Sequence, residues 1–214
     1  MKRRGTIAIL ALFGQWPLPI HGQATVEGQV ALPKTHPALV ANERYEIVSE
    51  AGILKTDPPR AVVYLEGHFP APKNLSTRQI TQKDLTFRPN LLPIQRGTRV
   101  EFPNEDETYH NIFSYSPAKR FDLGRYPPEE SPTPSVVFDH VGLVTLRCDI
   151  HEHMRALVLV LDTPYFTISD WQGNYRLPNL PAGRFVLKAW VSSKVTLGHP
   201  VELTSGEVRH VNLP

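Results

Sequence analysis

Three residues able to bind a transition metal lie close together in the sequence. Cys148, the only cysteine among the 214 residues, is followed by His151 and then by Met154. A thiolate, an imidazole and a thioether are ligands of copper sites that transfer single electrons, once a second imidazole joins them. His110 is the candidate for this further ligand, because it follows a predicted strand elsewhere in the chain.

Each of these residues also has a structural interpretation. A lone cysteine at the end of a strand is commonly a small core residue, a histidine beside Tyr109 can lie on the surface, and a methionine before an apolar strand can belong to the core. Their joint occurrence favours a metal site. Asn111 is predicted to donate backbone or amide hydrogen bonds to the thiolate. Three interpretations of His153 stay open: a solvent-exposed histidine, an extra ligand, or part of a surface that docks a partner.

The segments around the candidate ligands are predicted to be short strands. Leu143–Leu146 precedes the ligand loop and Ala156–Leu161 follows it; the second is apolar at consecutive positions, so both of its faces are expected to be covered. Arg99–Phe102 alternates as a half-buried strand and leads toward His110, whereas Ile94–Gly97 is predicted to be a turn. Proline is abundant (21 residues) and long helical patterns are absent, which predicts an all-β fold.

A long loop is predicted between these strands. Ser114–Ser135 has few strand signals and many turn-forming residues, and loops of this length are often functional. Its basic residues Lys119, Arg120 and Arg125 suit an acidic redox partner. The alternative is an ordinary solvated loop.

The amino terminus has the pattern of an export signal. A basic start at Lys2–Arg4 precedes the apolar run Ile7–Phe13 and small residues at Gly22–Ala24. Residues 1–24 are therefore predicted to be a signal peptide, with the mature chain starting at Thr25 in the periplasm or another exported location. The alternative is an ordinary first strand or helix. The apolar run is too short to span a membrane.

The net charge restricts the kinds of partner that the chain is expected to bind, and the cysteine count restricts the state of its thiol. The predicted leader holds three of the 23 basic residues and none of the 21 acidic ones, so the mature chain has a net charge of −1. This balance gives no support to binding of nucleic acid or of an anionic membrane. A single cysteine cannot form an internal disulfide, so burial or metal ligation must protect its thiol after export.

Residues 78–162 resemble a cupredoxin of the plastocyanin and amicyanin type. The motifs that carry the resemblance are Phe87-x-Pro89, Gly97-x-x-Val100-x-Phe102-x-Asn104-x-Asp106, His110-Asn111, Val141-Gly142 and Cys148-x-x-His151-x-x-Met154. The resemblance implies a Greek-key β-sandwich with one type 1 copper ion. It further implies that His110, Cys148 and His151 bind copper strongly and that Met154 is a distant axial ligand.

Two details refine this resemblance. Segments such as Phe121–Gly124 and Thr163–Phe166 are similar to exported cupredoxin-domain proteins often labelled methylamine-utilisation-like. Amicyanin-type ligand loops often place a proline beside the second histidine, but here Ile150 and Glu152 flank His151. Loop stiffness and partner choice are therefore expected to differ.

A second resemblance covers the carboxyl-terminal part. Its motif, Asp170-x-x-Gly173-x-Tyr175-x-Leu177-x-x-Leu180-Pro-Ala-Gly183-x-Phe185, is similar to transthyretin-like, carboxypeptidase-regulatory-type β-sandwiches, and Asp170–Gly173 is predicted to be a hairpin turn. Such sandwiches normally open with strands like those predicted before residue 67. This implies a discontinuous sandwich of residues 25–67 and 164–214 that hosts residues 78–162 as an insertion. The alternative is that residues 25–67 extend the cupredoxin sheet.

These observations favour an exported one-electron carrier that cycles between Cu(II) and Cu(I) and serves a redox partner protein. No other cluster of acids, bases or nucleophiles in the sequence suggests substrate turnover, so the chain is predicted not to be an enzyme. One alternative is copper storage, delivery or sensing, and another is a structural binding module with a metal site. A cysteine nucleophile paired with His110 or His151 is disfavoured, because it leaves Met154 without a role.

Overall fold

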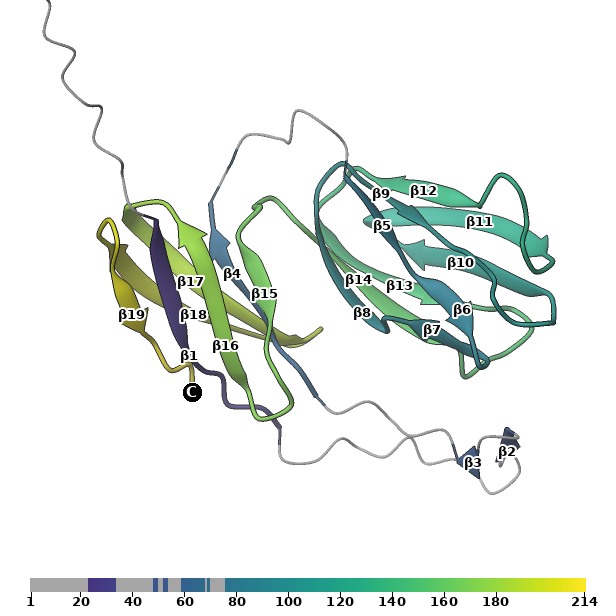
Figure 1. The fold of residues 1–214 in the computed structure, drawn as a ribbon, viewed down its shortest axis with the longest axis horizontal. Coiled ribbons are helices and arrows are strands. Elements are labelled where there is room, and N and C mark those ends of the chain that lie inside the picture. The colour runs from purple at the N-terminus through teal and green to yellow at the C-terminus, as the bar shows by residue number, and fades with distance from the viewer. Residues whose placement is uncertain (1–22, 34–47, 50–51, 54–58, 68, 70–75) are drawn as a thin grey trace, which may run out of the picture.

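The computed structural model describes residues 23–33, 48–49, 52–53, 59–67, 69 and 76–214. Within these residues the chain forms strands and turns and contains no helix, which confirms the predicted all-β class. Figure 1 shows two β-sandwiches next to each other. We call the one built from strands of residues 24–66 and 166–210 the outer sandwich, and the one built from residues 77–161 the inner sandwich.

The outer sandwich has two sheets around an apolar core. The strand orders are β16-β1-β19 and β15-β4-β17-β18. The bounds are β1 Ala24–Gln29, β4 Val62–Glu66, β15 Phe166–Ile168, β16 Asn174–Leu180, β17 Gly183–Ser192, β18 Val195–Leu203 and β19 Val208–His210. Both sheets contribute buried apolar residues, among them Val26, Leu65, Leu177 and Leu187. The alternating pattern of these strands thus produces a two-layer structure.

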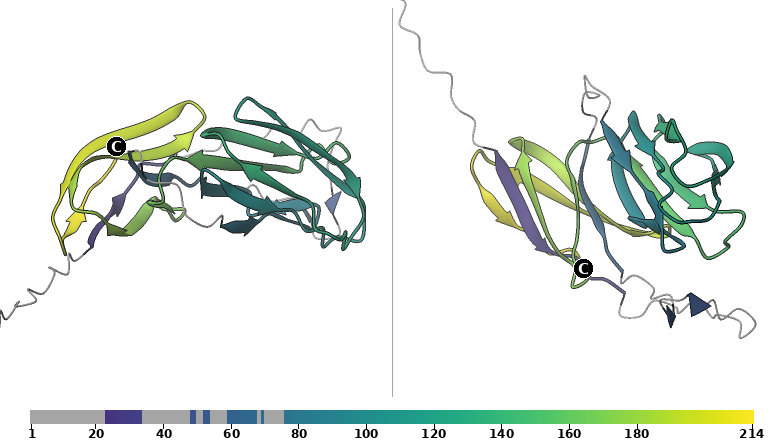
Figure 2. Two further views of the ribbon diagram at one scale, coloured as in Figure 1. Left: turned by 90° about the horizontal axis from the view of Figure 1, so that it is seen from above. Right: turned by 45° about the vertical axis from the view of Figure 1, so that its right-hand side comes forward.

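Strands from both ends of the described chain interleave in the outer sandwich. β1 is parallel to β19 and antiparallel to β16, and β4 is antiparallel to β15 and β17. These pairings join residues that precede the inner sandwich in the sequence to residues that follow it, and the paired strands lie together beside the inner sandwich (Figure 2). They support the division into a host of residues 25–67 and 164–214 and an inserted unit of residues 78–162, which we retain as a proposal.

The inner sandwich also has two main sheets, with the orders β11-β10-β13-β14-β8 and β12-β9-β5, and a separate β6-β7 hairpin. The bounds are β5 Thr77–Gln79, β6 Thr81–Lys83, β7 Thr86–Arg88, β8 Leu91–Gln95, β9 Thr98–Glu101, β10 His110–Ser116, β11 Lys119–Tyr126, β12 Ser135–Phe138, β13 Gly142–Arg147 and β14 Arg155–Leu161. The core includes Phe102, Ile112, Phe138 and Leu146. Outside both sandwiches, β2 (Val48–Ser49) pairs with β3 (Gly52–Ile53).

A third apolar cluster joins the two sandwiches. Its buried members are Val62 and Trp190 of the outer sandwich and Leu91, Leu159 and Leu161 of the inner one. Alternate residues of β14 enter the inner core and this junction, so both faces of the strand are covered, as its uninterrupted apolar sequence predicts. The packing of apolar side chains across the junction favours a fixed arrangement of the two sandwiches.

The prediction of a long loop over Ser114–Ser135 is wrong for most of that segment. The segment contains the end of β10, a turn and all of β11, and the two strands form an antiparallel hairpin. Residues 127–134 are the part that connects strands. β11 is an edge strand whose residues alternate between exposed and half-buried, which explains its weak hydrophobic signal.

The same hairpin changes the interpretation of its basic residues. Lys119 Nζ lies 2.8 Å from Asp139 Oδ1, and Arg125 Nη2 lies 2.9 Å from Asp149 Oδ2. Two of the three basic groups predicted to suit an acidic partner are therefore engaged within the molecule.

Two predicted turns also need correction. Residues Leu91–Gln95 form β8, so the turn predicted from Ile94 starts too early; Pro93 is tolerated there because β8 is an edge strand. Asp170–Gly173 forms a tight turn but no hairpin, because the flanking strands β15 and β16 belong to different sheets. A Cβ on Gly173, whose φ is +89°, would lie 2.1 Å from the Val30 carbonyl oxygen, so this change of layer requires glycine.

The predicted leader falls largely on residues 1–22, which lie outside the described part of the chain, and it stays a prediction. The last residue of the predicted leader, Ala24, is fully buried and pairs with Leu180 at the start of β1. Among the described residues, no helix has the length and apolarity to cross a membrane.

Candidate metal centre

The candidate ligands come from the ends of neighbouring strands. His110 is the first residue of β10, and Cys148 directly follows β13, the strand beside it in the five-stranded sheet. Since these strands are antiparallel, the start of one meets the end of the other at the same edge of the sheet. His151 lies in the loop between β13 and β14. Two strands and one short loop thus bring the three residues together.

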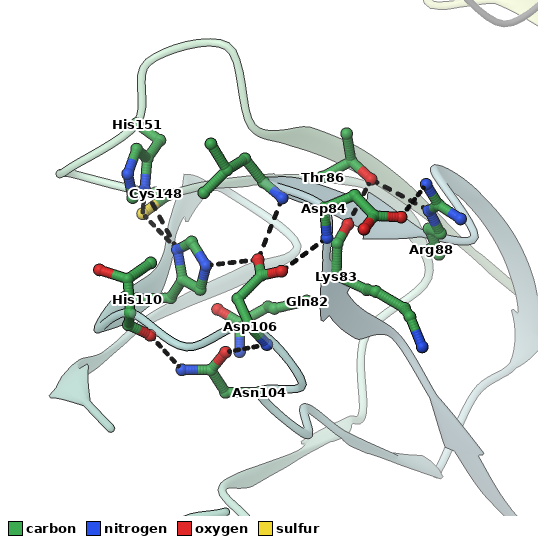
Figure 3. Close-up of polar contacts among 12 residues, drawn as sticks. Gln82, Lys83, Asp84, Thr86, Arg88, Asn104, Asp106, His110, Cys148 and His151 are labelled. Carbon is green, nitrogen blue, oxygen red and sulfur yellow. Dashed lines mark hydrogen bonds and ion pairs between the residues drawn. The ribbon is translucent and has the colours of Figure 1, made fainter. Parts of the chain in front are cut away.

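The three side chains form a compact triangle (Figure 3). His110 Nδ1 lies 4.0 Å from Cys148 Sγ, His151 Nδ1 lies 3.8 Å from the same sulfur, and the two Nδ1 atoms are 3.1 Å apart. The cysteine is 4% exposed and His110 is fully buried, whereas His151 is half-buried. Among the described residues, this is the group of histidine, cysteine and acidic side chains spaced to hold a metal ion.

The size of the triangle fits a transition-metal ion. A point equidistant from the three ligand atoms lies about 2.1 Å from each, close to usual metal–nitrogen distances of about 2.0–2.1 Å and metal–sulfur distances of about 2.3 Å. Two imidazoles and one thiolate in a trigonal arrangement are the strong ligands of blue-copper sites. The residues present therefore fit one copper ion.

The surroundings of the sulfur favour a thiolate. Burial raises the pKa of the Cys148 thiol, but hydrogen bonds from His110 and from three backbone N–H groups outweigh burial, so the pKa lies below its ordinary value. These N–H groups belong to Asn111, Ile150 and His151. The predicted donation from Asn111 is thus made by its backbone. A thiolate held this way is ready to bind a metal ion.

The His110 ring is fixed from its other side. Its Nε2 lies 2.8 Å from Asp106 Oδ2, so Nδ1 is the nitrogen that faces the sulfur. Burial lowers the pKa of His110, but the hydrogen bonds to Cys148 and Asp106 outweigh it and the pKa is raised. A metal ion must therefore displace a proton from this pair when it binds.

The half-buried His151 differs from His110 in its electrostatics. Burial, followed by the nearby rings of His110 and His153, lowers the pKa of His151. A neutral imidazole is the form that binds a metal. The neighbouring side chain of Ile150 is 39% exposed, so this is the side of the triangle nearest to solvent.

Two buried amides fasten the surrounding loops. Asn104 Oδ1 accepts a hydrogen bond from the Asp106 backbone N–H at 3.1 Å, and Asn104 Nδ2 donates to the Thr108 carbonyl at 2.8 Å. Asn111 Nδ2 donates to Asp122 Oδ1 at 2.7 Å, and its Oδ1 accepts from the Asp149 backbone N–H at 3.3 Å. The first amide shapes the approach to His110, and the second ties the ligand loop to the β10–β11 hairpin.

Met154 and His153 occupy different positions relative to the triangle. Met154 is 1% exposed in the inner core, and its N–H donates to the His151 carbonyl at 3.0 Å, which closes the ligand loop. Its axial role stays a prediction. His153 is outside the ligand cluster, and its Nε2 lies 3.0 Å from the Leu85 carbonyl oxygen. The extra-ligand alternative for His153 therefore has no support from this geometry.

Sequence reasoning missed the role of Asp106. The residue belongs to the motif that carries the resemblance, but no contact with His110 was expected of it. An acid four positions before a candidate ligand histidine is a signal that could have found it. The contribution of the β6–β7 turn, which contacts Asp106, has no comparable signal in the sequence.

The comparisons with known proteins give distant similarities. No protein-family model and no curated protein matches the sequence. Amicyanin from Paracoccus versutus is 16% identical, with a TM-score of 0.35 over 46% of this chain and 96% of amicyanin. The purple cupredoxin from Nitrosopumilus maritimus is 26% identical, with a TM-score of 0.34 over 38% of this chain and 97% of that protein.

A copper-containing nitrite reductase from Thermus scotoductus is 20% identical, with a TM-score of 0.36, and the match covers 61% of this chain but 28% of the reductase. These solved structures are cupredoxins or contain copper, but the similarities are too low to assign the chain to a family. The described matches leave the transthyretin-like resemblance of the outer sandwich without support. The proposal that follows rests on the geometry of the ligands.

Proposed function

We propose that this chain is an exported type 1 copper protein that carries single electrons between redox partner proteins. The observation that carries the proposal is the triangle of His110 Nδ1, Cys148 Sγ and His151 Nδ1, whose size and ligand types suit one copper ion. Copper supplies the Cu(II)/Cu(I) couple when bound. Storage or delivery of copper uses the same ligands, so the experiment below must separate these functions.

The way in which the ligands are held supports electron transfer. His110 is fully buried and hydrogen-bonded through its second nitrogen, and the sulfur accepts hydrogen bonds from three backbone amides. Ligands fixed by the fold move little between two oxidation states, which suits repeated gain and loss of one electron. His151 lies closer to solvent and offers a short route to a docked protein.

Several finer points belong to the same proposal. Met154 is a weak axial ligand, each chain holds one copper ion, and the chain turns over no substrate. The protein acts after export to the periplasm or an equivalent location, with a protein rather than nucleic acid as its partner. The outer sandwich, of transthyretin-like type in this proposal, packs on the inner one through the apolar junction and sets how the copper unit is presented.

Titration of the mature protein with Cu(II), followed by visible and electron paramagnetic resonance spectroscopy, tests the proposal. We expect an intense thiolate-to-copper band that saturates at one equivalent and is bleached and restored by reductant and oxidant. Cys148→Ala must abolish the band, whereas His153→Ala, beside the cluster, must retain it. Preferential Cu(I) binding with rapid exchange and no reversible colour would instead favour delivery.

A further inference from the structure

We propose that Asp106 is a positioning residue that lowers the reduction potential of the metal centre through its contact with His110. The inference rests on the proposed function, because it concerns the same site. Asp106 Oδ2 lies 2.8 Å from His110 Nε2, while His110 Nδ1 faces Cys148. Among the described residues, the ion pairs of Asp106 involve His110 alone, so its charge is directed at the ligand ring.

The carboxylate acts on the histidine in two ways. It accepts a hydrogen bond from the Nε2–H group, which fixes the tautomer that leaves Nδ1 free to bind a metal. It also makes the ring a more electron-donating ligand, and stronger donation favours the higher of two oxidation states. Asp106 should therefore stabilise Cu(II) relative to Cu(I).

Asp106 is held in this position by the turn between β6 and β7. Asp84 N–H donates to its Oδ1 at 2.6 Å, and Leu85 N–H donates to its Oδ2 at 3.0 Å. Both turn residues have positive φ, 52° and 53°, the backbone of a two-residue hairpin turn that usually contains glycine or asparagine. A leucine in this conformation is uncommon and costs free energy, which is expected where a turn must present its amides to a functional group.

The same turn reaches the opposite side of the site. The Leu85 carbonyl oxygen lies 3.0 Å from His153 Nε2, on the ligand loop that carries His151. The backbone of one residue, Leu85, thus contacts Asp106 through its N–H and the ligand loop, at His153, through its carbonyl oxygen. The β6–β7 turn holds Asp106 against His110 while also restraining the ligand loop.

The test is Asp106→Asn in the full mature protein. An asparagine oxygen in place of Oδ2 keeps the acceptor for His110 and Leu85, but the charge and the bond from Asp84 are lost. We expect the thiolate-to-copper band to persist. In a solution held at the midpoint reduction potential of the wild-type protein, the Cu(II)/Cu(I) ratio of the variant should fall at least tenfold. For a one-electron couple, tenfold corresponds to an increase of about 59 mV in the potential.

Two further variants distinguish the contact between Asp106 and His110 from the effect of any negative charge near the site. Glu107→Gln removes an exposed negative charge next to Asp106 in the sequence, and we expect less than a twofold change in the ratio. Asp106→Glu keeps the negative charge but places the carboxylate on a longer side chain. Its Cu(II)/Cu(I) ratio should lie between those of Asp106→Asn and the wild-type protein. An unchanged potential in Asp106→Asn, or an equal shift in Glu107→Gln, would overturn the inference.

A measurement on the wild-type protein covers the case in which Asp106→Asn does not fold. In the Cu(I) form, nuclear magnetic resonance should show a slowly exchanging proton on His110 Nε2. An Nε2 without a proton contradicts the inference even when copper binds and cycles. If the wild-type protein shows no thiolate-to-copper band, the proposed function fails first, so the two failures are distinguishable.

Discussion

The outer and inner sandwiches have similar two-layer folds but different interiors. Among the described residues, the outer core is apolar, and the buried polar residues in and next to it are the hydroxyl residues Thr25, Thr163 and Ser169. The inner sandwich buries amides and an imidazole as well as hydroxyls: Gln82, Thr98, Asn104, His110, Asn111 and Ser114. Burying such groups costs free energy unless each has a hydrogen-bond partner, so the inner sandwich accepts a cost that the outer one avoids.

Several buried polar groups of the inner sandwich hold the loops around the proposed metal centre. Asn104 shapes the loop that delivers Asp106 and His110, and Asn111 ties the ligand loop to β10 and β11. Behind them, Gln82 Nε2 donates to the Tyr126 hydroxyl at 2.6 Å, and that hydroxyl donates to the Phe102 carbonyl at 2.9 Å. The difference indicates that the outer sandwich is built for packing, whereas one region of the inner sandwich is built to position ligands.

The largest expected difference between the two sandwiches is their response to copper. A metal that binds the native state alone stabilises it by about 4 kcal/mol at a free concentration 1,000 times its dissociation constant. We expect copper to stabilise the inner sandwich by this order and to affect the outer one only through the junction. Amide hydrogen exchange in the core of each sandwich, followed with and without copper as the temperature rises, measures the gain in stability of each. Cys148→Ala should remove the gain that copper gives. Equal protection of both cores by copper would show that they unfold as one unit.

The next prediction concerns the junction. Leu159 is 6% exposed and packs in the cluster shared by both sandwiches. Leu159→Ala should lower the free energy of unfolding by about 2–5 kcal/mol, because it leaves a cavity in a packed cluster. It should also lower the unfolding transitions of both sandwiches in a denaturant titration, with the copper spectrum unchanged.

A matched control for the junction is Leu187→Ala, which truncates a fully buried leucine in the outer core alone. A loss of stability of similar size is expected there, but confined to the transition of the outer sandwich. If Leu159→Ala likewise lowers a single transition, the junction does not couple the two sandwiches.

A smaller effect is expected at the turn that changes layer in the outer sandwich. Gly173→Ala introduces a Cβ 2.1 Å from the Val30 carbonyl oxygen at a φ of +89°. Backbone strain of this kind costs about 1–3 kcal/mol, measured as a lower denaturation midpoint. Gly206→Ala is the control, because φ there is +78° and no heavy atom would lie within 4 Å of the new Cβ. An equal cost at both positions would mean that the clash with Val30 is relieved without penalty.

The sequence predicts some parts of the inner sandwich much better than others. The type and spacing of Cys148, His151 and His110 suffice to predict a metal centre, because few other roles use a thiolate and imidazoles together. The continuous apolar run of β14 also predicts coverage on both faces. By contrast, β11 is an edge strand with weak alternation, and the contact between Asp106 and His110 depends on the conformation of a loop. Edge strands and loop contacts are set by tertiary structure, so local patterns do not reveal them.

The smallest expected effect separates two interpretations of Lys119, which was predicted to suit a redox partner. The adjacent lysine and a hydrogen bond from His140 lower the pKa of Asp139 to about 2. A carboxyl whose pKa is depressed by folding contributes stability above its unfolded pKa of about 4, and this contribution is lost as the pH falls toward 2. Since the pair is largely solvated, the contribution should be below about 1 kcal/mol.

Asp139→Asn should therefore flatten the acid limb of the stability curve slightly, as measured by denaturant midpoints at several pH values. If Lys119 instead serves mainly in docking, Asp139→Asn should leave that limb unchanged and strengthen binding of an acidic redox protein by freeing the ammonium group.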